Sequence, residues 1–132
     1  MRATLMYGAG DVRVEDVPDS TIKLPTDALV RITASCICGS DLHPYSSMSA
    51  ADGPARMGHE FIGVVEDTGA EVTTVQKGDL VVSPFSVSDN TCQLCREGLQ
   101  TACADPQATF WDGIHDEGAQ AEAIRVPLAD GT

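Results

Sequence analysis

The sequence predicts a mainly β fold of the β-rich α+β class: a partly open barrel of short strands with a protruding metal-binding lobe. Three observations support this prediction. Short β-prone stretches recur along the chain and are separated by Gly, Pro, Asn and Asp turns. No long stretch shows the apolar period of an amphipathic helix. One compact segment, residues 89–103, carries three of the five cysteines.

The first third of the chain has the pattern of antiparallel strands joined by tight turns. Residues 3–7 form the first predicted strand, and a glycine-rich turn leads to residues 12–17. Apolar and polar residues alternate over 12–17, which predicts a half-buried strand. Residues 28–34 resume strand character, and Val30, Ile32 and Ala34 are expected on one face.

The middle of the chain combines a short helical turn with further strands. The turn is predicted after residue 39, with Ser40 as its N-cap. Residues 46–56 are rich in small residues and Pro, which favours a surface loop. Residues 57–67 are predicted to form a strand, in which Gly58 and Gly63 indicate a bulge or a close approach of another backbone.

The remaining strands are predicted to be short. Residues 72–75 are β-prone, residues 80–82 have the apolar run of a buried strand, and residues 118–127 form the last predicted strand. With 132 residues, the chain is expected to be one domain, 1–132, whose lobe spans about 86–115. Because aromatic residues make up only 5% of the chain, the core is expected to consist of Val, Ile, Leu and Ala.

The charge balance excludes some classes of partner. The formal net charge is −12, with only 8 Lys and Arg residues, so nucleic acid and anionic membrane surfaces are not expected partners. No apolar run approaches the ~20 residues that span a bilayer, and no secretory signal is recognisable. An odd number of cysteines without such a signal favours a reducing, cytoplasmic location.

The cysteine-rich segment has the spacing of a metal site. Two residues separate Asp89 from Cys92, two separate Cys92 from Cys95, and seven separate Cys95 from Cys103. Zinc prefers four tetrahedral ligands drawn from thiolate, imidazole and carboxylate. A disulfide, a redox pair or unpaired surface thiols are the alternatives. A redox Cys-x-x-Cys pair usually opens a helix after a strand, a pattern that is not found here.

A second set of residues suggests a catalytic centre. Cys38, His59 and Glu60 carry the ligand types of a catalytic zinc, which has three protein ligands and one open position. From spacing alone, each residue also has an ordinary role: Cys38 as a small buried side chain, His59 as a satisfied polar group and Glu60 as an exposed strand residue. Ser40 and Asp41, nearby in the sequence, could equally be helix-cap residues.

Four motifs occur together and in order. They are Cys38-Gly-Ser-Asp-Leu-His43, Gly58-His-Glu-Phe-Ile-Gly-Val-Val65, Lys77-Gly-Asp-Leu-Val-Val82 and the cysteine-rich segment. In this order they resemble the N-terminal, GroES-like catalytic domain of the zinc-dependent medium-chain alcohol dehydrogenases, over essentially the whole chain. The resemblance implies a GroES-like, partly open β barrel.

The resemblance also implies roles for individual residues. Cys38 and His59 correspond to ligands of the catalytic zinc, and Glu60 corresponds to an acidic neighbour that coordinates the metal in some members. Asp41 corresponds to a carboxylate that orients the zinc-bound histidine.

Two further catalytic positions and the lobe follow from the same resemblance. Ser40 and His43 correspond to a proton relay from the alcohol to solvent. In the lobe, the three cysteines correspond to structural zinc ligands and Asp89 stands where the family usually has a fourth Cys. Asp89 is expected to complete the tetrahedron, and a weakened or empty site is the alternative. Cys36 matches no family ligand and is expected to be a buried or half-buried thiol.

The resemblance predicts an enzyme of which this chain is expected to be only a portion. The family transfers hydride from an alcohol to NAD or NADP, but no Gly-x-Gly-x-x-Gly fingerprint of a Rossmann domain is present. We therefore expect a portion of a zinc-dependent NAD(P) alcohol, polyol or aldehyde dehydrogenase, inactive without the coenzyme domain. The expected partners are a small alcohol or aldehyde and, in the full-length protein, further copies of the chain. A stand-alone, non-catalytic zinc-binding or interaction module on the same fold is the alternative.

Overall fold

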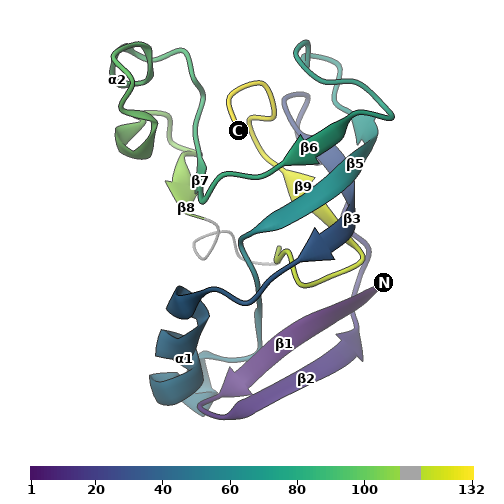
Figure 1. Cartoon of the computed structure of the whole chain (residues 1–132), viewed down its shortest axis with the longest axis vertical. Helices are drawn as coiled ribbons and strands as arrows, with labels where there is room; N and C mark the ends of the chain where they lie inside the picture. The colour runs from purple at the N-terminus through teal and green to yellow at the C-terminus, as the bar shows by residue number, and fades with distance from the viewer. Residues whose placement is uncertain (111–116) are drawn as a thin grey trace.

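Antiparallel strands in three open sheets build the part of the chain that the computed structural model describes, residues 1–110 and 117–132 (Figure 1). The strands are β1 Arg2–Gly8, β2 Asp11–Asp16, β3 Ala28–Ser35, β4 Ala55–Arg56, β5 Phe61–Thr68, β6 Leu80–Val82, β7 Ser86–Val87, β8 Thr109–Phe110 and β9 Ala123–Val126. The helical segments are short: η1 Gly39–Asp41, α1 Leu42–Ser47, η2 Ala50–Asp52, α2 Gln93–Arg96 and η3 Gln100–Ala102. The predicted strand-rich fold class is confirmed.

The two larger sheets have the strand orders β2-β1-β4 and β6-β5-β3-β9, and β7 pairs with β8 alone. β7 and β8 form the base of the lobe, whose helix α2 lies at one end of the molecule, while α1 lies toward the other end (Figure 1). The last residues of the predicted lobe, 111–115, lie outside the described part of the chain. No helix among the described residues is long and apolar enough to cross a membrane.

Edge position exposes two strands that the sequence predicted to be half-buried or buried. Val12 and Val14 of β2 are 40% and 68% exposed, and Leu80 and Val82 of β6 are 69% and 70% exposed. Both predictions of burial were wrong. β2 and β6 each pair with one neighbour only and stand at the margin of their sheets. Among the described residues, no element buries these side chains.

Register shifts interrupt β3 and correct the prediction for its inward face. Val30 is buried, but Ile32 is only half-buried and Ala34 is exposed. The pairing of β3 with β5 shifts between Leu29 and Val30, and again between Ile32 and Ala34. Because a bulge breaks the alternation of side chains, the three residues do not share one buried face.

The two glycines predicted to allow a close backbone approach do so. A Cβ at Gly63 would lie 2.4 Å from Cγ1 of Val30, and one at Gly58, where φ is +94°, would lie 2.6 Å from the Gln120 amide nitrogen. The positive φ of Gly58 also interrupts extended backbone, so β5 begins at Phe61 and not at residue 57 as predicted.

Other boundaries also differ from the prediction. The predicted loop 46–56 contains the end of α1, η2 and β4, and the β-prone residues 72–75 form no strand. The last strand is limited to β9, although Ala121 makes an isolated bridge with Ala3. Strand propensity is overridden at 72–75 because both carboxylate oxygens of Asp130 accept hydrogen bonds from Thr73 and Thr74.

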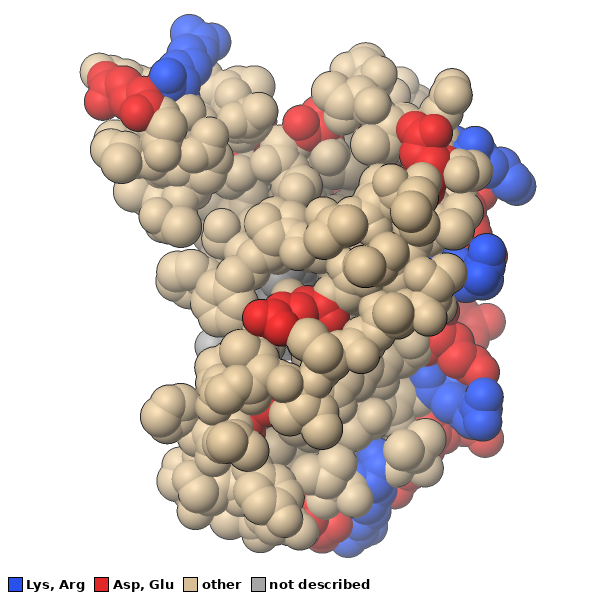
Figure 2. All heavy atoms as spheres, viewed as in Figure 1, with Lys and Arg blue, Asp and Glu red and all other residues tan. Residues whose placement is uncertain are grey.

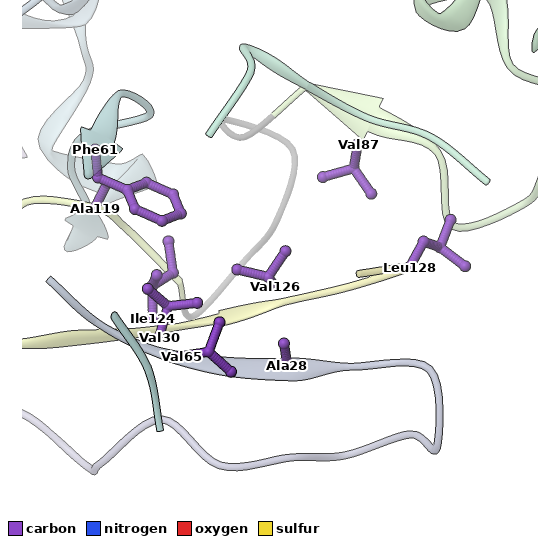
Figure 3. Packing of buried hydrophobic residues seen from close by; sticks show 9 residues of the cluster. All are labelled: Ala28, Val30, Phe61, Val65, Val87, Ala119, Ile124, Val126 and Leu128. Carbon is purple, nitrogen blue, oxygen red and sulfur yellow. The ribbon is translucent and has the colours of Figure 1, made fainter. Parts of the chain in front are cut away.

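The core lies between the four-stranded sheet and the segments that cross it (Figure 3). It is mostly aliphatic, as the composition predicted, with Phe61 as its aromatic member. The buried cluster consists of Ala28, Val30, Phe61, Val65, Val87, Ala119, Ile124, Val126 and Leu128. Val87 comes from β7, so the base of the lobe is packed onto the same core.

Candidate metal centres

The first candidate centre forms where β3 ends and β5 begins. Ser35 pairs with Phe61 at the end of the antiparallel ladder, so the residues that follow β3 and those that precede β5 meet. Cys38 is the N-cap residue of η1, while His59 immediately precedes Glu60 in the segment before β5. One potential ligand atom from each of these three side chains lies within 4.8 Å of the other two.

His59 is only 6% exposed, and a carboxylate, a hydroxyl and an aromatic ring lie around its imidazole. An oxygen of Asp41 lies 3.6 Å from Nδ1, and the Ser40 hydroxyl lies 3.0 Å from Nε2. The Phe85 ring meets the imidazole edge-on, with 4.7 Å between ring centroids. A carboxylate at Nδ1 favours the tautomer that carries its proton there, which leaves the Nε2 lone pair for a proton or a metal.

The side chain of Asp41, and not that of Ser40 as predicted from the sequence, hydrogen-bonds to the backbone at the start of η1. Its Oδ2 accepts a hydrogen bond of 2.8 Å from the backbone amide of Cys38, the N-cap residue. The prediction of Ser40 as N-cap was wrong: Ser40 lies inside η1 and its side chain faces His59. The carboxylate therefore holds the Cys38 backbone with one oxygen and lies beside the His59 ring with the other.

His43 stands apart from these groups. It lies exposed on α1, where its carbonyl oxygen accepts hydrogen bonds from the hydroxyls of Ser46 and Ser47. Within the described residues, no hydrogen bond joins the His43 ring to Ser40. The structure thus places Ser40 at the cluster and leaves the predicted relay through His43 as a prediction.

Two polar contacts flank Glu60. Its Oε2 accepts a hydrogen bond of 2.7 Å from the thiol of Cys36, and the thiols of Cys36 and Cys38 together lower the pKa of Glu60. In return, Glu60 raises the pKa of the Cys36 thiol. Sequence reasoning expected Cys36 to be buried or half-buried, but the residue is exposed. It also missed Phe85, for which the only signal was a rare aromatic residue just before the lobe.

The second candidate centre lies in the lobe. Cys92 is the N-cap residue of α2, Cys95 is buried within α2, and Cys103 follows η3 directly. Together with Asp89, each offers a potential ligand atom within 4.8 Å of the others. The two short helical segments turn the chain back on itself, so that donors close in sequence converge.

The carboxylate of Asp89 is oriented by its own loop. Oδ1 accepts hydrogen bonds from the backbone amides of Thr91 and Cys92, at 3.0 and 3.2 Å, and from the thiol of Cys103 at 3.1 Å. These hydrogen bonds, the one from the Thr91 amide foremost, lower the pKa of Asp89. The group is therefore an anion aimed at the three thiols.

The donor set of the lobe fits zinc. The sulfurs of Cys92 and Cys103 are 4.0 Å apart, close to the ~3.8 Å separation in a tetrahedron with Zn–S bonds of about 2.3 Å. Backbone amides, first that of Ala104, lower the pKa of Cys92, while burial raises the pKa of Cys95. A divalent cation that replaces the thiol protons would offset part of the negative charge of the three thiolates and Asp89.

Residues 24–130 match the family described as the alcohol dehydrogenase GroES-like domain. The chain belongs to this family. It is 41% identical, over its whole length, to a medium chain reductase/dehydrogenase, ucsI, of Acremonium sp., and 39% identical to zinc-type alcohol dehydrogenase B of Aspergillus flavus. It spans 45% and 30% of the lengths of these relatives, respectively.

Solved structures agree with this assignment. Alcohol dehydrogenase TADH from Thermus sp. ATN1 superposes with a TM-score of 0.83 at 35% identity, covering 98% of this chain and 38% of that chain. A zinc-dependent alcohol dehydrogenase 2 from Streptococcus pneumonia superposes with a TM-score of 0.85, also at 35% identity, covering 100% of this chain and 37% of that one. The expected GroES-like architecture is confirmed, and the family is one of zinc-type oxidoreductases.

Proposed function

We propose that this chain forms the catalytic portion of a zinc-dependent NAD(P) alcohol, polyol or aldehyde dehydrogenase. The main support is the convergence of Cys38, His59 and Glu60 from two strand ends, with their ligand atoms within 4.8 Å of one another. A structure of a relative, a zinc-binding dehydrogenase from Sinorhizobium meliloti, is bound to NADP and superposes with a TM-score of 0.65 at 28% identity. Binding of NAD or NADP and homo-oligomer formation stay predictions for the full-length protein.

The cluster has the chemistry that a catalytic zinc requires. Thiolate, imidazole and carboxylate are all zinc ligands, and three protein ligands leave one position for substrate. Zinc bound here would supply a Lewis acid for the oxygen of a small alcohol or aldehyde, while hydride would be exchanged between the nicotinamide and the carbon that carries this oxygen.

The residues around the cluster hold its ligands and handle a proton. Asp41 fixes the orientation of His59 from the Nδ1 side and ties down the Cys38 backbone. Ser40, whose hydroxyl is already at the cluster, can accept a hydrogen bond from a substrate hydroxyl and pass its proton outward. His43, exposed on the adjacent α1, is the group that we propose as the next acceptor.

The lobe serves a structural purpose in this proposal. Asp89, Cys92, Cys95 and Cys103 would enclose a four-coordinate zinc with no position left for substrate. Its base strand β7 contributes Val87 to the core. Metal in the lobe would therefore stabilise the region from which Phe85 reaches His59.

Zinc stoichiometry tests the two sites. Elemental mass spectrometry of the purified chain should give about two zinc ions per chain, one for each donor set. Cys38→Ser and Cys92→Ser should each lose about one. Zinc absent from the wild type would contradict the proposal, whereas retention in Cys38→Ser would show that this cluster holds no metal.

We expect activity only in a full-length protein that also contains the region of the relatives that this chain does not span. The full-length protein should oxidise alcohols with NAD or NADP, and its activity should be abolished by a chelator and restored by zinc. Ser40→Ala should reduce kcat, while its matched control Ser49→Ala, at an exposed serine whose hydroxyl accepts from the Ala51 amide, should not. A full-length protein that binds zinc but converts no alcohol, polyol or aldehyde would favour the alternative of a non-catalytic zinc-binding module.

A further inference from the structure

Cys36 contacts the candidate catalytic cluster without belonging to its donor set. Its sulfur lies 2.7 Å from Oε2 of Glu60. The three donors that converge are Cys38, His59 and Glu60, and Cys36 is not among them. The Cys36 side chain thus contacts Glu60, a candidate metal ligand, without being a candidate ligand itself.

The β3–β5 ladder places the two residues opposite each other. Since Ser35 pairs with Phe61 in antiparallel register, the next residue after β3, Cys36, faces the residue before β5, Glu60. The backbone of Cys36 is held as well, because its carbonyl oxygen accepts a hydrogen bond from the Gln120 side chain. Gln120 is itself packed against Gly58, where no Cβ would fit.

A carboxylate on a rotatable side chain needs such a contact to present a lone pair in one direction. Glu60 is only partly buried and lies in a segment outside the strands, so its backbone does not restrict the side chain. A thiol that donates to Oε2 fixes the carboxylate while leaving its other lone pairs free. Groups that hydrogen-bond metal ligands from outside the donor set typically contribute 10–100-fold to metal affinity.

We propose that Cys36 is a positioning residue that holds the Glu60 carboxylate in place for metal binding at the Cys38–His59–Glu60 cluster. The proposal rests on the proposed function, because it requires a metal at this cluster. Cys36 acts through Glu60 and does not itself bind the metal. A hydroxyl at the same position would do the same work, whereas a methyl group would not.

Zinc affinity, measured by competition with a chromogenic chelator, tests the proposal. The relevant binding step is the one that is lost in Cys38→Ser, because that step belongs to the Cys38–His59–Glu60 cluster. Cys36→Ala should weaken this step about tenfold or more, and Cys36→Ser should stay within about threefold of the wild type. In a Glu60→Gln background, Cys36→Ala should have no further effect. Thr33→Ala is the matched control, because the Thr33 hydroxyl also joins β3 to β5, through the Ile62 carbonyl, but does not contact Glu60.

Cobalt(II) separates positioning from ligation. The sulfur-to-cobalt charge-transfer intensity of the cluster should be the same in Cys36→Ser and the wild type. Loss of this intensity would show that Cys36 is a ligand and would overturn the proposal, as would unchanged zinc affinity in Cys36→Ala. If the wild type has no binding step that depends on Cys38, the proposed function fails together with this inference. An intact wild-type step that is insensitive to Cys36→Ala refutes the inference alone.

Discussion

Arg125 and Asp27, 98 positions apart in the sequence, form an ion pair in the interior, with Nη1 3.3 Å from Oδ2. Asp27 is completely buried, and Glu117, which is also buried, lies 3.5 Å from Nε of the same guanidinium. One cation thus serves two buried carboxylates. The backbone amides of Lys23 and Leu24 also donate to Asp27, which ties the segment before β3 to β9.

Removing this cation should strongly destabilise the chain. Arg125→Met removes the guanidinium that the two buried carboxylates share, so the free energy of unfolding should fall by about 3–5 kcal/mol. Urea unfolding followed by circular dichroism at pH 7 would measure it. Arg31→Met, which breaks the exposed pair with Glu66, should change stability by less than about 1 kcal/mol. Equal effects of the two substitutions would contradict this account.

Asp130 gives a prediction about pH. Partial burial favours its protonation, but hydrogen bonds from Thr73 and Thr74 more than offset this and lower its pKa from 3.8 to about 2. Because the unfolded chain binds the proton first, this contribution is fully present above about pH 4 and is lost as the pH falls toward about 2.

Asp130→Asn should therefore be less stable than the wild type by about 1 kcal/mol at pH 7, since solvent partly screens the group. The difference should shrink between about pH 4 and pH 2. Urea unfolding at several pH values would show it, with the exposed Asp52→Asn as the control. A difference that stays constant down to pH 2 would exclude the charged hydrogen bonds as its cause.

The carboxylate in the lobe can be tested directly. Asp89→Ala should lose the zinc of the lobe or bind it at least tenfold more weakly, because three thiolates leave the tetrahedron incomplete. Asp89→Cys should retain that zinc, since it restores a fourth ligand. Chelator competition would rank the variants. Asp105→Ala, an acidic neighbour outside the donor set, should match the wild type. Normal zinc binding in Asp89→Ala would show that Asp89 is not a ligand.

Gly63 provides a test of packing between β5 and β3. Gly63→Ala would place a methyl group 2.4 Å from Val30 Cγ1 and 2.6 Å from the Arg31 carbonyl oxygen, so we expect a loss of about 1–3 kcal/mol. The matched change Gly39→Ala meets no atom within 4 Å and should stay within about 0.5 kcal/mol of the wild type. Thermal unfolding of both variants would decide. A stable Gly63→Ala chain would mean that the strands can move apart at little cost.

Much of the fold could be predicted because strand propensity and turn residues act over a few positions. The hairpin of β1 and β2 follows from two β-prone stretches around a glycine turn, with Gly10 at φ +74°. The burial of β2 and β6 could not be predicted in this way. An alternating or apolar stretch has the same pattern whether or not another layer covers it, so burial is decided by what packs over the strand in the folded chain.

The two candidate centres differ in how far apart their donors lie in the sequence. In the lobe, all four donors lie within 15 residues, so short turns are enough to bring them together, and their spacing alone pointed to a metal site. The other cluster joins residues from two strand ends, so residue types could only suggest it and the motif resemblance was needed to support it. Cys36 had no recognisable role in the sequence, because its contact with Glu60, 24 residues away, depends on the register of β3 against β5.

Residue identity and short-range spacing were enough to predict the strand-rich class, the family and the donor types at both centres. The folded chain was needed to show which strands are exposed, that Ser40 faces His59 and does not cap η1, and that Arg125 pairs with Asp27. The physical reason is that such contacts join residues distant in sequence. Their energy depends on burial and geometry, which exist only once the sheets have formed.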